Sequence, residues 1–239
     1  DNAKNPKKIK ENVFEVIKDN LSIGLDPKKI TFFVQSGVPE LNELTMFYLN
    51  LVTLSRLKRN PTIKEEIKQR GEDQVPILEQ VCEIVDTFNN TYGDTLVRPK
   101  YVIPDNKSSR RLPGTDGKAK MSKSAGNCIY LSDDTETVRK KVMSMYTDPN
   151  HIKVEDPGNT KDNPVFCEDR EKFEELKKHY ERGGLGDKVV KEYLFEVLES
   201  ILTPIRQRRA YYDEHPEIVE EIIKEGTSHA REKAREVLD

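Results

Sequence analysis

The chain has 239 residues, of which 35% are hydrophobic and 35% charged, a polar composition that is still that of a globular protein. Its 40 basic and 43 acidic residues give a net charge of −3, which excludes a global attraction to nucleic acid and leaves only local basic patches for RNA. Three widely spaced cysteines without a CxxC pair argue against a disulfide framework or zinc site and favour a reducing, cytoplasmic setting. We expect neither a membrane span nor a signal peptide.

The first half of the chain is predicted to combine helices with a buried strand. Asn5 followed by Pro6 is typical of a helix start, and apolar residues at helical spacing continue to a stop at Gly24. Residues 30–34 form a short apolar run with β-branched and aromatic side chains, which predicts a strand buried on both faces. A helix before such a strand favours a parallel sheet with helical crossovers. Further elements are expected as helices over 40–58, 61–70 and 75–91 and an extended segment over 98–104.

From residue 132 onward the pattern is helical throughout. Helices are expected over 135–146, 168–182 and 187–210, and Pro204 is expected to kink or break the last of them. His215-Pro216 starts a further helix that ends at Gly226, and Ser228 caps the final helix. The sequence therefore predicts an α/β part over residues 1–131, followed by an all-helical part over 132–239.

The most distinctive stretch is the loop from Gly114 to Asn127, which is rich in glycine, lysine and serine. Such a segment cannot bury a core face and is typical of a surface loop. Its ammonium groups, hydroxyls and backbone N–H groups are the donors that a polyphosphate needs. The alternative is a solvated basic loop without a ligand, the commoner fate of a lysine- and serine-rich run that stands alone.

Lys120 to Ser124 in this loop read KMSKS, the signature of class I aminoacyl-tRNA synthetases. Five further segments resemble the tryptophanyl-tRNA synthetase family: 24–27 (GLDP), 33–36 (FVQS), 59–62 (RNPT), 71–74 (GEDQ) and 182–187 (RGGLGD). The resemblance covers nearly the whole chain. Tyrosine enzymes, the nearest relatives, usually carry a different residue where Glu72 stands, so tyrosine specificity is the lesser alternative.

The resemblance implies a Rossmann-type catalytic domain, only part of which is present, over residues 1–131 and an anticodon-binding helical domain over 132–239. It implies activation of L-tryptophan by ATP with Mg²⁺, and transfer of the tryptophan to the 3′ end of tRNA(Trp). It also implies a homodimer, for which the predicted helices over 40–58 and 75–91 are candidate faces.

The same resemblance assigns roles to single residues. Lys120 and Lys123 are the candidate catalytic residues, because their charges suit the pyrophosphate as it leaves. Gln74 and Gln35 are the candidate tryptophan-binding residues, and no residue is assigned to a metal. The candidate ATP-binding residues are Gly71, Glu72, Asp73, Leu112, Lys120, Met121, Ser122, Lys123 and Ser124.

Several of these residues have alternative interpretations. Asp73 also suits the N-cap of the helix that follows it, and Gln35 suits an ordinary turn. The four histidines are expected at the surface. A cluster of basic and aromatic residues is either a solvated helix end or an RNA contact; it consists of Arg206, Arg208, Arg209, Tyr211 and Tyr212.

The chain departs from the family pattern in three places. The HIGH-type phosphate motif, with the strand and helix around it, is absent. A second gap falls between Arg70 and Gly71, where the family has a further stretch with an acidic residue for the indole nitrogen, and a shorter gap falls near 166–167. Either this is a shortened chain that only binds tRNA or dimerises, or the full protein has segments that this sequence leaves out. An intact mass near 27.6 kDa would favour the first alternative.

Overall fold

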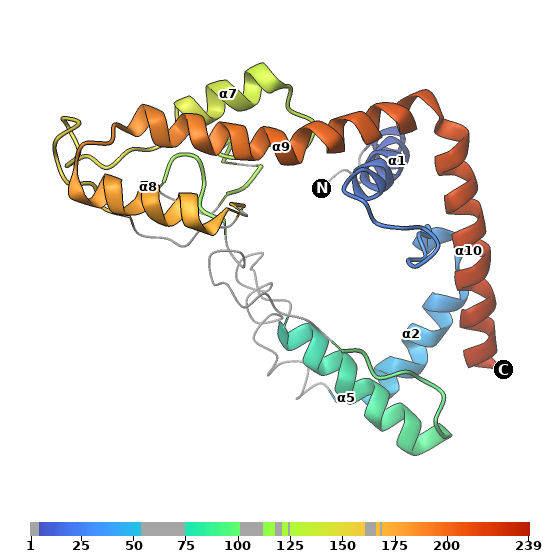
Figure 1. Ribbon diagram of the computed structural model, residues 1–239. Coiled ribbons are helices and arrows are strands. Elements are labelled where there is room, and N and C mark those ends of the chain that lie inside the picture. Colours follow the sequence, from blue (N-terminus) through green and yellow to red (C-terminus); the bar gives the residue numbers. More distant parts are fainter. Residues whose placement is uncertain are drawn as a thin grey trace. The chain divides into compact units, whose positions relative to one another are not determined.

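The computed structural model describes residues 5–53, 75–100, 112–117, 121–123, 125–160, 166–167 and 169–239. Their contacts divide the chain into two compact units, one of residues 1–17, 25–102 and 215–239 and the other of residues 18–24 and 103–214. Helices dominate both units (Figure 1), and the described residues include no strand beyond a single bridge position at Pro113. The parallel sheet therefore stays a prediction, as does a domain boundary at 131/132. No helix in the described part is long and apolar enough to cross a membrane.

In the first unit, helix α10 packs against α2, and α2 packs against α5 (Figure 1). Three buried side chains, Val38, Leu44 and Ala234, form one core cluster of this unit. Tyr48 extends the apolar contact and meets the Phe88 ring edge-on, with the ring centroids 5.9 Å apart. The elements of this unit are most of α1 (Pro6–Ser22), a short 3-10 turn η1 (Gln35–Gly37), α2 (Glu40–Leu51), α5 (Val75–Tyr92) and α10 (Pro216–Leu238).

A buried carboxylate joins α2 to α10. Glu40 Oε1 accepts hydrogen bonds from Nε of Arg231 and of Arg235, each at 2.8 Å. The bond from Arg231 is the main reason that the pKa of Glu40 falls to about 2. Because the two arginines are four residues apart, one turn of α10, they reach the same carboxylate and fix where α10 lies on α2.

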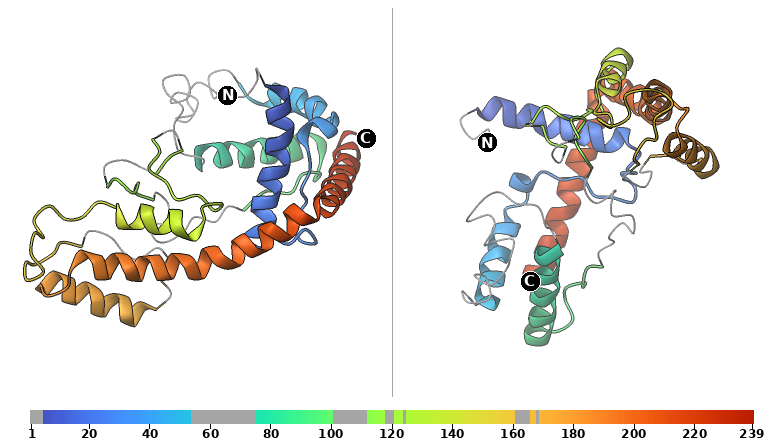
Figure 2. Two further views of the ribbon diagram at one scale, coloured as in Figure 1. Left: turned by 90° about the horizontal axis from the view of Figure 1, so that it is seen from above. Right: turned by 90° about the vertical axis from the view of Figure 1, so that its left-hand side faces the viewer.

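The second unit is organised on the long helix α9 (Asp187–Glu214), which Figure 2 shows as one continuous element. Helix α7 (Thr135–Met143) packs along α9 and places its fully buried Val138 and Val142 against Leu198 and Leu202. Helix α8 (Arg170–Arg182) precedes α9. Both α7 and α8 start at an aspartate whose side chain accepts a backbone N–H of the first turn, at 2.7 Å from Thr137 and 2.9 Å from Lys172.

The predicted basic and aromatic cluster on α9 makes contacts within the second unit. Arg206 pairs with Glu199 at 2.5 Å and donates to the backbone carbonyl of Asp133 at 3.1 Å. Arg208 donates to the carbonyl of Ser22 and Arg209 pairs with Asp19, at the end of α1. These arginines hold α7 and the end of α1, a structural role that neither sequence-based interpretation included.

The predicted strand over 30–34 is wrong. The structure has no regular element there, and Ile30 and Phe33 are 39% and 42% exposed. The segment lies against α10 instead, because the backbone N–H of Val34 donates a hydrogen bond to Thr227 Oγ1 at 3.2 Å. A short apolar run fits several environments, so its composition alone did not identify this one.

Helix α9 runs through Pro204 without ending, so of the kink or break predicted there the break is wrong. The helix end predicted at Gly226 and the cap predicted at Ser228 are also wrong, because helix α10 runs through both residues. Gly226 has a packing reason instead, because a Cβ atom there would stand 2.1 Å from the carbonyl oxygen of Phe32.

Candidate active site: the lysine-rich loop

Backbone hydrogen bonds fold the lysine-rich loop on itself and join it to Leu112, just before the loop. The N–H of Met121 donates to the carbonyl of Leu112 at 3.0 Å, and the N–H of Thr115 donates to the carbonyl of Asn127, also at 3.0 Å. The N–H of Gly126 donates to the carbonyl of Lys123 at 3.2 Å. The described part of the loop thus has a base that backbone hydrogen bonds define.

A buried asparagine lies at the centre of this base. Asn127 is 4% exposed, and its Oδ1 accepts the backbone N–H of Ser122 at 2.8 Å. Its Nδ2 donates to Asp116 Oδ1 at 3.2 Å. A Cβ atom on Gly114 would stand 2.1 Å from this Nδ2, so only glycine leaves room for the amide.

The predicted phosphate-binding residues that the structure describes lie together in this loop. Lys123 is exposed, whereas Met121 and Ser122 are half-buried. Ser122 Oγ accepts the backbone N–H of Ala125 at 3.2 Å, which folds the turn that carries Lys123. Half-burial of Met121 agrees with an anchoring role, and Leu112 is its backbone partner.

The segment after the loop connects the loop to α7. The backbone N–H of Tyr130 donates to Asp133 Oδ2 at 2.8 Å, and Lys141 pairs with the same oxygen at 2.5 Å. The Lys141 ammonium also lies 4.5 Å from the centroid of the Tyr130 ring. Hydrogen bonding with the thiol of Cys128 raises the pKa of the Tyr130 hydroxyl.

The structure tests few of the other predicted site residues. Gly71, Glu72, Asp73 and Gln74 lie outside the described residues, as do Lys120 and Ser124. Gln35 is exposed at the start of η1, in the first unit. In the described part of the chain, no group of three His, Cys, Asp or Glu side chains is placed to hold a metal ion.

One histidine that the sequence assigned to the surface is buried. The side chain of His151 is 1% exposed, its Nδ1 lies 3.3 Å from Asp187 Oδ2, and its ring meets the Tyr180 ring with centroids 4.6 Å apart. Tyr180 donates its hydroxyl hydrogen to Asp187 Oδ1 at 2.7 Å. The group ties the polar connector after α7 to the start of α9, a long-range contact with no local sequence signal.

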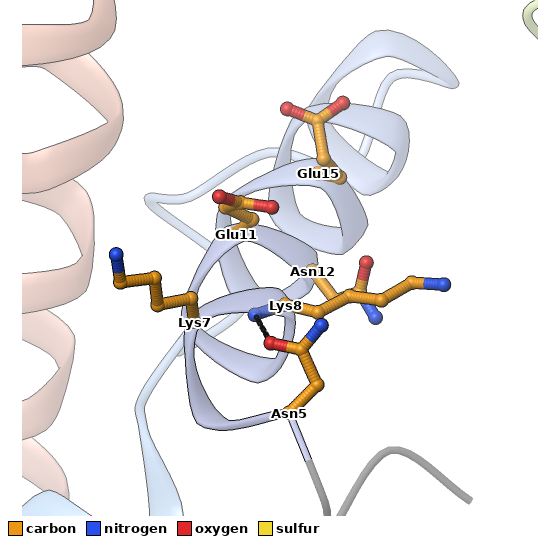
Figure 3. A pocket seen from close by; sticks show the side chains of 6 residues that line it. All are labelled: Asn5, Lys7, Lys8, Glu11, Asn12 and Glu15. Atoms are coloured by element: carbon orange, nitrogen blue, oxygen red, sulfur yellow. Dashed lines mark hydrogen bonds between the residues drawn. The ribbon is translucent and has the colours of Figure 1, made fainter.

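A surface hollow on α1 carries none of the predicted site residues (Figure 3). Its lining has mixed charge and comes from one helix: Asn5, Lys7, Lys8, Glu11, Asn12 and Glu15. Asn5 Oδ1 accepts the backbone N–H of Lys8 at 3.2 Å, which confirms Asn5 as the predicted N-cap. The hollow is therefore a feature of a capped helix end, and it adds nothing to the candidate site.

Known proteins match the chain along its full length. The profile of a family described as tRNA synthetases class I (W and Y) matches residues 60–203. A tryptophan–tRNA ligase of Clostridium longisporum is 51% identical over 276 residues, covering 100% of this chain and 81% of that protein. The chain belongs to the tryptophanyl-tRNA synthetase family. A second member, from Streptococcus mutans, is 48% identical over 278 residues, covering 100% of this chain and 82% of its own.

A solved member of the family shares the fold. The tryptophanyl-tRNA synthetase of Campylobacter jejuni, complexed with ADP and tryptophan, matches with a TM-score of 0.78 and 26% identity. The match covers 99% of this chain and 83% of that one, and shows the class I synthetase fold. The match with the Clostridium longisporum enzyme supports the predicted internal gaps. It runs over 276 aligned positions, 37 more than the 239 residues of this chain, so positions of that enzyme have no counterpart here.

Proposed function

We propose that this chain is a tryptophan–tRNA ligase, which activates L-tryptophan with ATP and transfers it to the 3′ end of tRNA(Trp). The observation that carries the proposal is 51% identity across the whole chain to a protein of that name. The KMSKS loop and its buried asparagine support the same function, since they supply a basic loop with a fixed base.

The reaction has two steps. A carboxylate oxygen of tryptophan attacks the α-phosphorus of ATP, the bond to the bridging oxygen breaks, and pyrophosphate leaves with its negative charge. The 2′-hydroxyl of the terminal adenosine of the tRNA then attacks the tryptophanyl carbonyl, and AMP leaves. The protein mainly positions these groups and neutralises the charge that builds on the phosphate oxygens.

In this proposal Lys120 and Lys123 act on the departing pyrophosphate, because each carries a point charge and the two are three residues apart in the same short loop. Ser122 and Ser124 offer hydroxyl donors, and Met121 anchors the loop through its half-buried side chain. The Oγ atom of Ser122 accepts the backbone N–H of Ala125, so the same hydroxyl that is proposed to meet a phosphate also shapes the turn of the loop.

The rest of the nucleotide and the amino acid are assigned to other segments. Gly71 lets the backbone approach the adenosine, Asp73 accepts from the ribose hydroxyls, and the backbone of Leu112 contacts adenine. Glu72 belongs to the same ATP-binding segment. Gln74 and Gln35 face the tryptophan. Mg²⁺ commonly reaches such sites on the phosphates of the nucleotide, and no residue of this chain is assigned to it.

We further propose a homodimer in the cytoplasm. The face of α2 exposes three large apolar side chains, Met46, Phe47 and Leu49, and α5 adds Val81. Clustered exposed apolar residues are typical of a protein interface. All three cysteines are free, as expected in a reducing compartment.

Two measurements test the function in order. The intact mass of the natural protein decides whether segments are missing from the 27.6 kDa of this chain. Tryptophan-dependent exchange of pyrophosphate into ATP then tests activation. Without exchange from a protein of verified full length, the ligase assignment is wrong; exchange with tyrosine alone would move it to the sister specificity, and tRNA binding without exchange would leave a binding module.

A further inference from the structure

We propose that Asn127 is a positioning residue, which holds the KMSKS loop in the shape that receives ATP, and that Asp116 is its partner. The inference rests on the proposed function, because it names what that function requires of the loop. Asn127 lies outside the five signature letters, and it is not among the residues to which binding or catalysis was assigned above.

Burial is the first argument. A primary amide has two N–H donors and one oxygen acceptor, and burying it without hydrogen-bond partners costs free energy. A buried amide is therefore expected to be hydrogen-bonded. Asn127 is 4% exposed, and both ends of its amide are bonded within the loop. Those bonds also fix its orientation: the backbone N–H of Ser122 can only donate, so it must face Oδ1, and the NH₂ group then faces Asp116.

The position of the two bonds is the second argument. One ends at Asp116 and the other at Ser122, so they bracket the stretch that contains Lys120 and lie next to Lys123. Fixing both flanks reduces the freedom that the loop loses when the lysines close on a polyphosphate. Such preorganisation matters for rate, because misplacing a reacting group by about 1 Å can cost about 10²-fold.

The negative charge of Asp116 allows an experiment that distinguishes a specific Asn127–Asp116 pair from a general loss of packing. Asn127→Asp keeps the acceptor for Ser122 and sets a second carboxylate opposite Asp116, with a separation of 3.2 Å between the present partner atoms. Adding Asp116→Asn restores the hydrogen bond in the opposite direction, with the amide at position 116 donating and the carboxylate at position 127 accepting. The double variant D116N/N127D should therefore recover what N127D loses.

The experiment measures tryptophan-dependent ATP–pyrophosphate exchange with the full protein. For N127A and N127D we expect kcat to fall by about 10- to 100-fold, with KM for tryptophan within about twofold of wild type. D116N/N127D should regain at least half of the lost activity on a logarithmic scale. Asn90→Ala, at an exposed position on α5, is the matched control and should leave both constants unchanged.

A second measurement is independent of catalysis. Trypsin cleaves after lysine, and Lys123 is exposed, so cleavage at Lys123 should be several-fold faster in N127A than in N90A, and ATP should slow it less. Asp116→Ala, at an exposed position, removes the second bond of Asn127 and keeps the first, so it should give a smaller rise in cleavage and a smaller loss of kcat than N127A. If N127A matches N90A in both measurements, Asn127 has no positioning role.

The two measurements also test the proposed function and the role of Asn127 separately. Wild-type protein without exchange activity would refute the proposed function, whereas faster cleavage of N127A would still establish that Asn127 orders the loop. If D116N/N127D is as impaired as N127D, Asp116 is not the functional partner. A drop in kcat shared by N127A and N90A would refute the specific role.

Discussion

Replacing Gly226 with alanine sets two opposing effects against each other. Gly226 lies inside α10, where alanine is favoured over glycine by about 1 kcal/mol in a helix interior. The new Cβ atom would, however, stand 2.1 Å from the carbonyl oxygen of Phe32 and 2.9 Å from its carbonyl carbon. Real Cβ atoms essentially never approach closer than 3.0 Å, so one of the two segments must move by about 1 Å.

That movement is opposed by neighbouring contacts of the same segment. The N–H of Val34 is bonded to Thr227 Oγ1 at 3.2 Å, and Gly37 lies against the Thr227 methyl group. Overpacking of this kind costs about 1–3 kcal/mol. Subtracting the helical preference leaves a net destabilisation of about 1 kcal/mol, which lowers the urea midpoint by about 0.5 M for an m-value of about 2 kcal/mol/M.

Equilibrium urea unfolding of G226A, at one fixed protein concentration, measures this difference. Ser228→Ala is the matched control, because Ser228 is exposed two residues further along the same helix and alanine is favoured there by a few tenths of a kcal/mol. We expect the midpoint to fall in G226A and to stay level or rise slightly in S228A. A midpoint that rises in G226A would refute the contact with Phe32.

Three further changes test the site and the two cores. Lys123→Ala should lower kcat for adenylate formation by roughly 10²–10³, with tryptophan binding almost unchanged, since the charge is needed as pyrophosphate develops; single-turnover kinetics with a tryptophan titration would detect it. Leu202→Ala, at a side chain 5% exposed, should cost about 2–5 kcal/mol in thermal unfolding, whereas Val189→Ala, at 51% exposed, should cost about 0.5 kcal/mol or less. The pKa of Glu40 falls from 4.5 to about 2 on folding, so its contribution to stability is present above pH 4.5 and is lost as the pH falls toward 2. Glu40→Gln should remove that part of the acid dependence; an unchanged unfolding profile between these pH values would contradict the Arg231 contact.

The helices that the sequence predicted well begin or end at local signals. The predicted start at Asn5-Pro6 agrees with α1, and the cap at Asn5 is present in the structure. The helix expected over 75–91 is α5, and the one expected over 168–182 is α8, which Asp169 caps. In each case a few neighbouring residues contain the whole signal, because caps and apolar periodicity act within one or two turns.

The features that the sequence did not predict depend on contacts between distant segments. Gly226 suggests a helix end when α10 is considered alone, and only the approach of Phe32 explains it. His151 lies in a polar segment, and only Tyr180 and Asp187 bury it. Residues 30–34 have strand composition, but their neighbour is a helix. A prediction from local propensity fails where tertiary packing contributes more free energy than the local conformational preference.

The lysine-rich loop combines both cases. Its letters carry the resemblance to the family, and the polyphosphate ligand was predicted from that resemblance and from the loop's composition, without any geometry. Its shape could not be predicted in the same way, because the bonds of Asn127 to Ser122 and Asp116 join residues five and eleven positions away. In the arrangement proposed here, the buried amide fixes the backbone at Ser122, while the side chain of Lys123 stays exposed. If the proposal holds, the signature supplies the charges, and Asn127, three residues after it, positions the backbone that carries Lys123.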